Sequence, residues 1–336
     1  MVSQRLKVIS TTLTLIATVF AACVVGLGAY TRLVDAGLGC PDWPGCYGKL
    51  LVPMSESAVE NANALYPERP LEHAKAWPEM IHRYAAGTLG LLILAIALIS
   101  VVNRRHPAQP TKLPLFVLAL VIMQAALGMW TVTHQLFPIV VVLHLLGGFL
   151  TFSLLFLITM RSSQILTPMR DPPVDRLKNW AMLGLIVVIM QITLGGWTAA
   201  NYAAAACPNF PTCYVEPTPW AFSEAFSLHT EHSSYEYAAH LSLAAKQTIH
   251  KVHRYGAVVT GIILGLLTIA LAVRATTSRY RYFAASLATI TTLQIGLGIG
   301  NVIWQFPLAV AVAHNLVGAF LLIVLLALNY SIRKKD

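Results

Sequence analysis

Four histidines lie in apolar stretches of the chain and could bind iron in pairs. His82 and His144 lie in the first half, and His253 and His314 repeat them roughly 170 residues later. Imidazoles at matched depth on neighbouring helices can bind one haem iron from opposite sides. A lone buried histidine more often bridges helices by a hydrogen bond, but two matching pairs favour haem. Another metal is disfavoured, because neither pair has a third ligand at every equivalent position.

The halves differ beside the first histidine of each pair. Glu79 precedes His82 by three residues, which places both side chains on one helical face, whereas the position equivalent to Glu79 is His250. A carboxyl group near a low-dielectric pocket can act as an acid or base, although a glutamate that ends a loop is more often only solvated. The first half therefore resembles an active site, and the second resembles a passive redox site.

An arginine directly follows the first histidine of each half. Arg83 and Arg254 could bind haem propionates at the outer interface. They could equally extend to lipid headgroups. Nearby glycines fit close approach of a flat macrocycle and equally fit ordinary helix packing; they are Gly87, Gly90, Gly147, Gly148, Gly261, Gly265 and Gly318.

The elements that must position these residues are membrane-spanning helices. The 336-residue chain is 57% hydrophobic and 11% charged, with a mean hydropathy of +0.66. A soluble globular protein carries about 25% charged residues, so this composition excludes a soluble enzyme and a disordered chain. Apolar stretches of roughly 20 residues predict eight spans, near 11–31, 81–102, 114–133, 138–160, 180–200, 252–273, 283–303 and 307–330.

The distribution of charge predicts the orientation of these spans. If both termini are cytoplasmic, that side has 15 Lys and Arg and three Asp and Glu. The other side then keeps eight of the 23 basic and eleven of the 14 acidic residues. Basic residues concentrate on the cytoplasmic side of membrane proteins. The net charge of +9 is thus a topology signal, and we expect no nucleic-acid partner.

Two loops, near 35–80 and 201–250, then lie outside the cytoplasm and contain four of the five cysteines. Cys40/Cys46 and Cys207/Cys213 share one spacing, and an oxidising compartment permits a disulfide within each loop. A redox-active dithiol is an alternative, and a zinc site would need all four thiolates together. Cys23, in the first span, is expected to be an apolar packing residue.

The chain reads as one four-helix unit used twice. The cysteine loops, Ile81-His82-Arg83-Tyr84 and Val252-His253-Arg254-Tyr255, and the segments around Gln124 and Gln294 all recur at nearly equal offsets. We predict an all-α polytopic membrane protein of two parallel four-helix bundles related by a pseudo-twofold axis. Residues 1–170 form the catalytic half and residues 171–336 the second half.

The ordered set of motifs resembles the haem A synthase family of cytochrome oxidase assembly. The resemblance covers essentially the whole chain. The matching residues are Gly28-Ala29-Tyr30-Thr31-Arg32-Leu33, the loop from Cys40 to Cys46, Glu79-Met80-Ile81-His82-Arg83, His144, His253 and His314.

This resemblance implies that the chain oxidises a methyl group of haem O to a formyl group, giving haem A, with oxygen from water. It implies that His82 and His144 bind the substrate haem beside the catalytic Glu79. It implies that His253 and His314 bind haem b, which relays electrons, and that both cysteine pairs form disulfides, as in the cysteine-containing bacterial type. The candidate propionate contacts are Arg32, Arg83 and Arg254.

The expected location is the bacterial inner membrane. Expected partners are the lipid bilayer, haem O and haem A, the haem O-producing farnesyltransferase, cytochrome oxidase assembly factors and a second copy of the chain. One alternative is a non-catalytic bis-histidine cytochrome, which would explain the histidines but not the single Glu79. Another is a transporter, which would need charged residues at mid-membrane, whereas the ionisable residues here cluster near one face.

Overall fold

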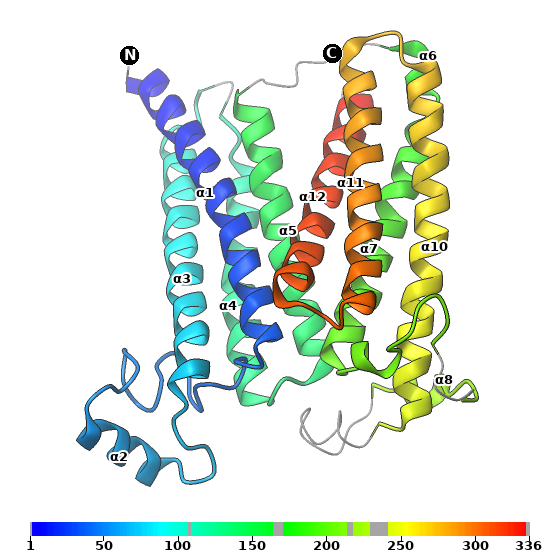
Figure 1. Cartoon of the computed structure of the whole chain (residues 1–336). Helices are drawn as coiled ribbons and strands as arrows, with labels where there is room; N and C mark the ends of the chain where they lie inside the picture. Colours follow the sequence, from blue (N-terminus) through cyan, green and yellow to red (C-terminus); the bar gives the residue numbers. More distant parts are fainter. Residues whose placement is uncertain (1, 107–108, 164–170, 214–217, 229–240, 334–336) are drawn as a thin grey trace. The chain divides into compact units, whose positions relative to one another are not determined.

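The computed structural model describes residues 2–106, 109–163, 171–213, 218–228 and 241–333, and these residues form helices and no strands (Figure 1). Eight helices within these described ranges are long and apolar enough to cross a membrane, which confirms the predicted all-α membrane class. They are α1 (Val2–Leu33), α3 (His73–Val102), α4 (Lys112–Thr133), α5 (Pro138–Ser163), α7 (Lys178–Ala200), α10 (Leu243–Arg274), α11 (Ser278–Ile303) and α12 (Leu308–Arg333).

Two helices begin well before the predicted spans. α3 starts at His73 rather than near residue 81, and α10 starts at Leu243 rather than near residue 252. Their first turns contain polar residues and therefore fall outside an apolar window, but they continue the same helices. The first turn of α10 is capped by Ser242, whose hydroxyl accepts a hydrogen bond from the amide of Ala245 at 3.1 Å. Glu79 therefore lies within a helix and not at the end of a loop.

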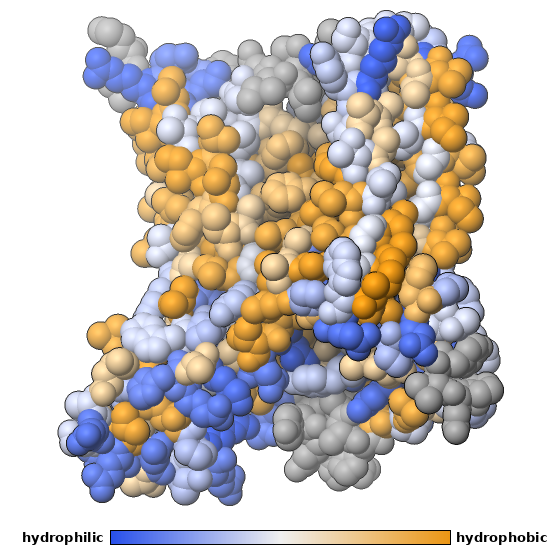
Figure 2. All heavy atoms as spheres, viewed as in Figure 1, coloured by the Kyte–Doolittle hydropathy of each residue, from blue (hydrophilic) through white to orange (hydrophobic). Residues whose placement is uncertain are grey.

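The helices expose apolar side chains along their middle sections and hydrophilic ones at their ends (Figure 2). Val19, Leu91 and Ile262 are 62%, 68% and 58% exposed, as expected for side chains that face lipid. Cys23 is also exposed, so the prediction that it is a packing residue was wrong. Polar side chains bond within the bundle instead, as between the hydroxyls of Thr18 and Thr159 at 3.0 Å.

The described chain divides into two compact units, one within residues 1–162 and the other within residues 163–336. In the first, α3 packs against α1 and α4; in the second, α10 packs against α7 and α11, and α12 packs against α7 and α11. Short helices lie in the connections: α2 (Glu56–Leu65), α6 (Pro172–Asp175), η1 (Ala204–Ala206) and α8 (Phe222–Ala225). The predicted boundary at residue 170 lies outside the described residues, and the pseudo-twofold relation stays a prediction.

A finer repeat than the predicted one runs through both units. α1, α4, α7 and α11 each end in one residue or two with positive φ, beginning at Asp35, Gln135, Tyr202 and Gln305. In each case the residue after this one donates a backbone hydrogen bond to the carbonyl five residues before it. These carbonyls belong to Thr31, Thr131, Thr198 and Asn301. This left-handed cap is a common way to satisfy the last carbonyls of a helix. Each of these helices precedes a histidine-bearing helix, so one type of helix end recurs before all four histidines.

Candidate functional site

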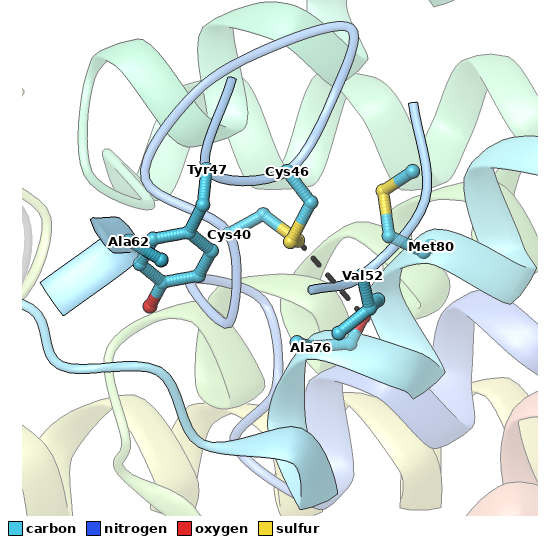
Figure 3. Close-up of a cluster of buried hydrophobic side chains, with 7 residues drawn as sticks. All are labelled: Cys40, Cys46, Tyr47, Val52, Ala62, Ala76 and Met80. Carbon is cyan, nitrogen blue, oxygen red and sulfur yellow. Dashed lines mark hydrogen bonds between the residues drawn. A yellow bond between two sulfur atoms is a disulfide. The ribbon is translucent and has the colours of Figure 1, made fainter. Parts of the chain in front are cut away.

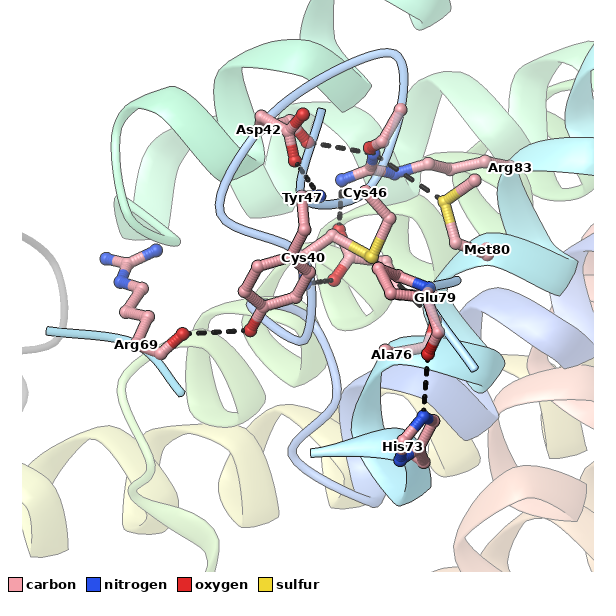
Figure 4. The surroundings of a disulfide bond; sticks show 12 residues. Cys40, Asp42, Cys46, Tyr47, Arg69, His73, Ala76, Glu79, Met80 and Arg83 are labelled. Atoms are coloured by element: carbon pink, nitrogen blue, oxygen red, sulfur yellow. Dashed lines mark hydrogen bonds and ion pairs between the residues drawn. A yellow bond between two sulfur atoms is a disulfide. The ribbon is translucent and has the colours of Figure 1, made fainter. Parts of the chain in front are cut away.

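Glu79 is held from two sides within the first unit (Figure 4). Its side chain lies on α3 and the residue is only 5% exposed. One carboxylate oxygen, Oε2, accepts a hydrogen bond from the backbone amide of Cys40 at 2.9 Å. The other, Oε1, pairs with the guanidinium of Arg83, one helical turn further on. The carboxyl group is therefore buried and fixed in orientation, which a loop-end glutamate would not be.

Arg83 joins α3 to the cysteine loop. Its Nη1 donates to the carbonyl of Asp42 at 2.9 Å, to that of Pro44 at 3.3 Å and also to that of Gly45. Its Nη2 bonds to Glu79. One guanidinium thus fixes both the carboxyl group and the loop above it. Contact with a haem propionate stays a prediction.

The first cysteine loop is a small folded unit in its own right. Cys40 and Cys46 form a disulfide and are both completely buried. They pack with Tyr47, Val52, Ala62, Ala76 and Met80 (Figure 3). The Tyr47 hydroxyl donates to the carbonyl of Arg69 at 2.9 Å, and burial raises its pKa, so it remains a donor. Met80 and Ala76 lie on α3 on either side of Glu79, so this core anchors the loop beside the carboxyl group.

The second unit repeats the loop without the acid. Cys207 and Cys213 form the second disulfide. Arg254 donates from Nη2 to the carbonyl of Cys207 at 2.8 Å and from Nη1 to that of Asn209 at 2.8 Å. Its Nε donates to Nε2 of His250 at 3.2 Å. Both predicted disulfides are confirmed; a redox role for them stays a prediction.

All four predicted histidines pack against a glycine of the preceding long helix. A Cβ on Gly28 would lie 2.9 Å from Cε1 of His82, and one on Gly195 or Gly298 would lie 3.1 Å from Cε1 of His253 or His314. A Cβ on Gly128 would lie 3.3 Å from Cε1 of His144. Any larger residue would push the ring aside. The glycines that contact the histidines are therefore these four, and sequence motifs alone do not mark them as histidine contacts.

The histidines fit a bound haem. The Nδ1 atoms of His82, His144 and His314 are buried and form no hydrogen bond with the described residues. The residues as a whole are only partly buried. A buried polar atom without a partner costs free energy unless another interaction compensates. Among the described residues there is no group of three His, Cys, Asp or Glu side chains that could hold a metal ion.

Arg32 and the histidines outside the two pairs have local partners where the structure describes them. Arg32 pairs with Asp35 at 3.8 Å, and His73 bonds to the carbonyl of Pro53 at 2.8 Å. His134 is the C-cap residue of α4. The loop histidines His229, His232 and His240 lie outside the described residues. The amide of Cys40 was missed as a partner of Glu79, because sequence does not reveal which backbone group a side chain reaches.

Comparison with known proteins matches the sequence to one family. The sequence model of the COX15-CtaA family, described as cytochrome oxidase assembly protein, matches residues 11–326. The haem A synthase of Shewanella oneidensis is 45% identical over 323 residues, covering 95% of each chain. The haem A synthase of Chelativorans is 30% identical, over 92% of this chain and 86% of its own. That of Caulobacter vibrioides is 28% identical, over 95% and 94%.

Proposed function

The chain belongs to the COX15-CtaA family of cytochrome oxidase assembly proteins, and on that premise we propose that it is an enzyme that converts haem O to haem A. The reaction oxidises a methyl group of haem O to a formyl group. Conversion of the methyl group and one water to the formyl group releases four protons and four electrons, so the reaction needs an external electron acceptor. The observation that supports this activity most directly is a buried carboxyl group, Glu79, one turn before His82 on α3.

We assign the substrate haem to His82 and His144 in the first unit. Glu79 lies on the same helix as His82, so its carboxyl group is positioned to accept protons from the reacting methyl group or from water. Arg83 and the Cys40 amide both donate to Glu79 and keep it in one orientation. Such preorganisation removes the need to reorient the carboxyl group during the reaction.

We assign haem b to His253 and His314 in the second unit. Haem b supplies one-electron redox chemistry when it is bound. His253 and His314 hold their rings against Gly195 and Gly298. His250 takes the place of the carboxylate and bonds to Arg254, so the residues of this unit bind and orient without providing a second acid.

The protein is a multi-pass membrane protein, with eight apolar helices in the part of the chain that the structure describes, in a family of bacterial inner-membrane enzymes. We propose that both termini are cytoplasmic, because the basic residues cluster at that side. Both cysteine loops, Glu79 and the histidines then lie toward the outer face. The haem O-producing farnesyltransferase and cytochrome oxidase assembly factors are the partners we propose.

A haem extract tests the proposed activity. The chain is expressed with a haem O-producing enzyme in cells that lack haem A, and the extracted haems are separated by reversed-phase HPLC. We expect haem A, and we expect Glu79→Ala to retain bound haem while haem A disappears. Haem b and haem O alone from the wild-type chain would instead identify a bis-histidine cytochrome that does no chemistry.

A further inference from the structure

Two exposed leucines follow the first cysteine loop and lie against α3. Leu50 is 78% exposed, and its neighbour Leu51 is exposed as well. The hydroxyl of Tyr84 on α3 donates a hydrogen bond to the carbonyl of Leu50. Single apolar side chains are common on a surface that faces water, but contiguous ones beside a membrane-spanning helix indicate an interaction surface. This leucine pair therefore needs a partner other than water.

The tyrosine that holds the leucine pair heads the lipid-facing side of α3. Tyr84, Leu91 and Leu98 are exposed and recur at intervals of seven residues, so they lie on one face of the helix. Exposed apolar side chains in the middle of a spanning helix face acyl chains. Because Tyr84 contacts Leu50, the leucine pair continues this lipid-facing surface beyond the helix itself.

The charges at the two ends of α3 give the depth of Tyr84 in the membrane. At about 1.5 Å per helical residue, the segment from Arg83 to Arg104 spans roughly 30 Å, which is the thickness of the hydrocarbon core. Tyr84, next to Arg83, therefore lies at the boundary between acyl chains and headgroups, where tyrosine and tryptophan are enriched. Arg254 and Arg274 bracket the apolar part of α10 in the same way. The leucine pair, bonded to Tyr84, lies at this boundary.

The backbone that leads to the leucine pair is already hydrogen-bonded within the loop. The amide of Cys46 donates to the carbonyl of Lys49 at 2.8 Å, and the amide of Lys49 donates back at 3.2 Å. The turn between them has positive φ at Tyr47 and Gly48, whose amides both donate to the carboxylate of Asp42, at 2.6 and 2.8 Å. Backbone groups without a partner are costly beside hydrocarbon. This segment can therefore rest on lipid at little cost in unpaired backbone groups.

The second unit repeats the arrangement with different side chains. Tyr255, the equivalent of Tyr84, is exposed and heads a lipid-facing side of α10 that continues through Val259 and Ile262. In the connection between α7 and α10, the ring centroid of Trp220 lies 6.2 Å from that of Tyr255, and Phe222 stacks on Trp220 at 5.1 Å. Both of these rings are exposed. In each unit, exposed apolar side chains of the loop thus lie beside the tyrosine at the membrane boundary.

We propose that both connections are anchored in the lipid leaflet on their side of the membrane. The first is anchored through Leu50 and Leu51, and the second through Trp220 and Phe222. The partner is the acyl-chain region of phospholipids directly below the headgroups. Side chains that enter this region bind more strongly as they bury more apolar area. This surface goes beyond the proposed function, because it does not depend on which reaction the chain catalyses.

In the first unit the anchor is linked to the carboxyl group of Glu79. The carbonyl of Gly45 accepts a hydrogen bond from Arg83, and Arg83 pairs with Glu79. Gly45 packs directly on the backbone of Lys49, because a Cβ on Gly45 would overlap the Lys49 carbonyl. Lipid that holds Leu50 therefore also restrains the part of the loop that orients Glu79. This consequence rests on the proposed function, whereas the lipid contact does not.

Photocrosslinking in intact membranes tests the lipid contact. Benzoylphenylalanine is introduced at position 50, and at position 65 as the control, because Leu65 is 71% exposed but lies on α2, beyond the end of α3 (Figure 1). After irradiation, mass spectrometry of the purified chain identifies the adduct. We expect phospholipid adducts at position 50 in several-fold higher yield than at position 65. Equal yields would overturn the proposal, and so would a crosslink from position 50 to another protein, because lipid would then not be the partner.

The same probe at position 222 tests the second unit. We expect phospholipid adducts there as well, since Phe222 stacks on Trp220 beside Tyr255. Adducts at position 50 without adducts at position 222 would overturn the proposal for the second unit and restrict the anchor to the first.

Haem A formation in lipid nanodiscs tests the consequence for Glu79. Leu50→Ser with Leu51→Ser removes the apolar side chains, and we expect a several-fold lower rate at equal haem content. Leu50→Phe with Leu51→Phe keeps an apolar surface and should restore the rate, and Leu65→Ser is the control. A serine variant as fast as wild type would show that the anchor does not orient Glu79. If the wild-type chain forms no haem A, the proposed function fails, while the crosslinks still decide the lipid contact.

Discussion

The two cysteine loops are built alike but control different chemistry. In both, an arginine one turn after the variable position donates to carbonyls of a disulfide-closed loop: Arg83 to Asp42 and Arg254 to Cys207. The residue one turn before each arginine differs: Glu79 accepts from the Cys40 amide, whereas His250 accepts from Arg254. A duplicated scaffold can thus retain its binding geometry while one copy alone keeps an acid beside the histidine. The shared parts explain binding, and the single exchanged residue accounts for the proposed reaction.

The largest expected effect comes from the exchanged position itself. Glu79→Gln keeps the size of the side chain and removes its ability to take up a proton at neutral pH, so we expect haem A formation to fall at least about a hundredfold. His250→Gln is the matched variant of the second unit, and we expect it to stay within a few-fold of wild type. Initial rates of haem A formation in membranes measure both. Equal losses in the two variants would mean that the halves do not differ as we infer.

A smaller effect is expected from the glycines that face the histidines. Gly28→Ala and Gly195→Ala each add a methyl group against a ring, and overpacking of this kind costs about 1–3 kcal/mol. We expect roughly tenfold weaker haem binding in the altered unit only, measured by haem titration and the reduced spectrum. Gly90→Ala is the control, because no atom lies within 4 Å of its added Cβ. Weaker haem binding in both units from either variant would contradict the inference that each unit has its own haem site.

Much of this architecture can be predicted from the sequence, because the lengths of the apolar segments and the positions of His, Cys and Arg are read directly from it. The eight spans and both disulfides are confirmed. The start of α3 was misplaced since His73, Lys75 and Glu79 make its first turns polar. Gln191 and Gln294 are visible in the sequence, but their hydrogen bonds to His253 and His314 depend on contact between helices, which sequence spacing alone does not define.

The disulfides should separate stability from catalysis. Removing either short cross-link by paired Cys→Ser substitution is expected to cost about 2 kcal/mol, seen as a lower thermal midpoint of the purified protein. Only Cys40→Ser with Cys46→Ser should also slow haem A formation, since the amide of Cys40 orients Glu79. Equal rates for the two pairs, at equal amounts of folded protein, would show that the loop does not position the acid.

The smallest expected effect concerns Asp171, at the ends of the helices opposite the cysteine loops. Buried Asp171 accepts hydrogen bonds from the amides of Thr276 and Thr277 at 2.9 and 3.0 Å, just before α11. Burial alone would raise the pKa of Asp171, but these bonds outweigh it and lower the pKa. Its stabilisation is therefore present above the unfolded pKa and is lost as pH falls through the folded pKa.

Asp171→Asn should lower the thermal midpoint by a few degrees at pH 7, a loss of about 1 kcal/mol, and the difference from wild type should shrink in acid. The first unit uses a neutral group near the start of α4, where the Gln109 amide donates to the Ser100 hydroxyl at 3.1 Å. Gln109→Leu should therefore differ from wild type by the same amount at each pH. A pH-independent difference for Asp171→Asn would refute the charged role.

The most direct measurement is the haem content of two double variants, determined by HPLC of extracts after expression with a haem O-producing enzyme. His82→Ala with His144→Ala should retain haem b and contain neither haem O nor haem A. His253→Ala with His314→Ala should lose haem b while haem O remains bound in the first unit. Haem b lost from the first variant and kept by the second would contradict the assignment of substrate and cofactor to the two units.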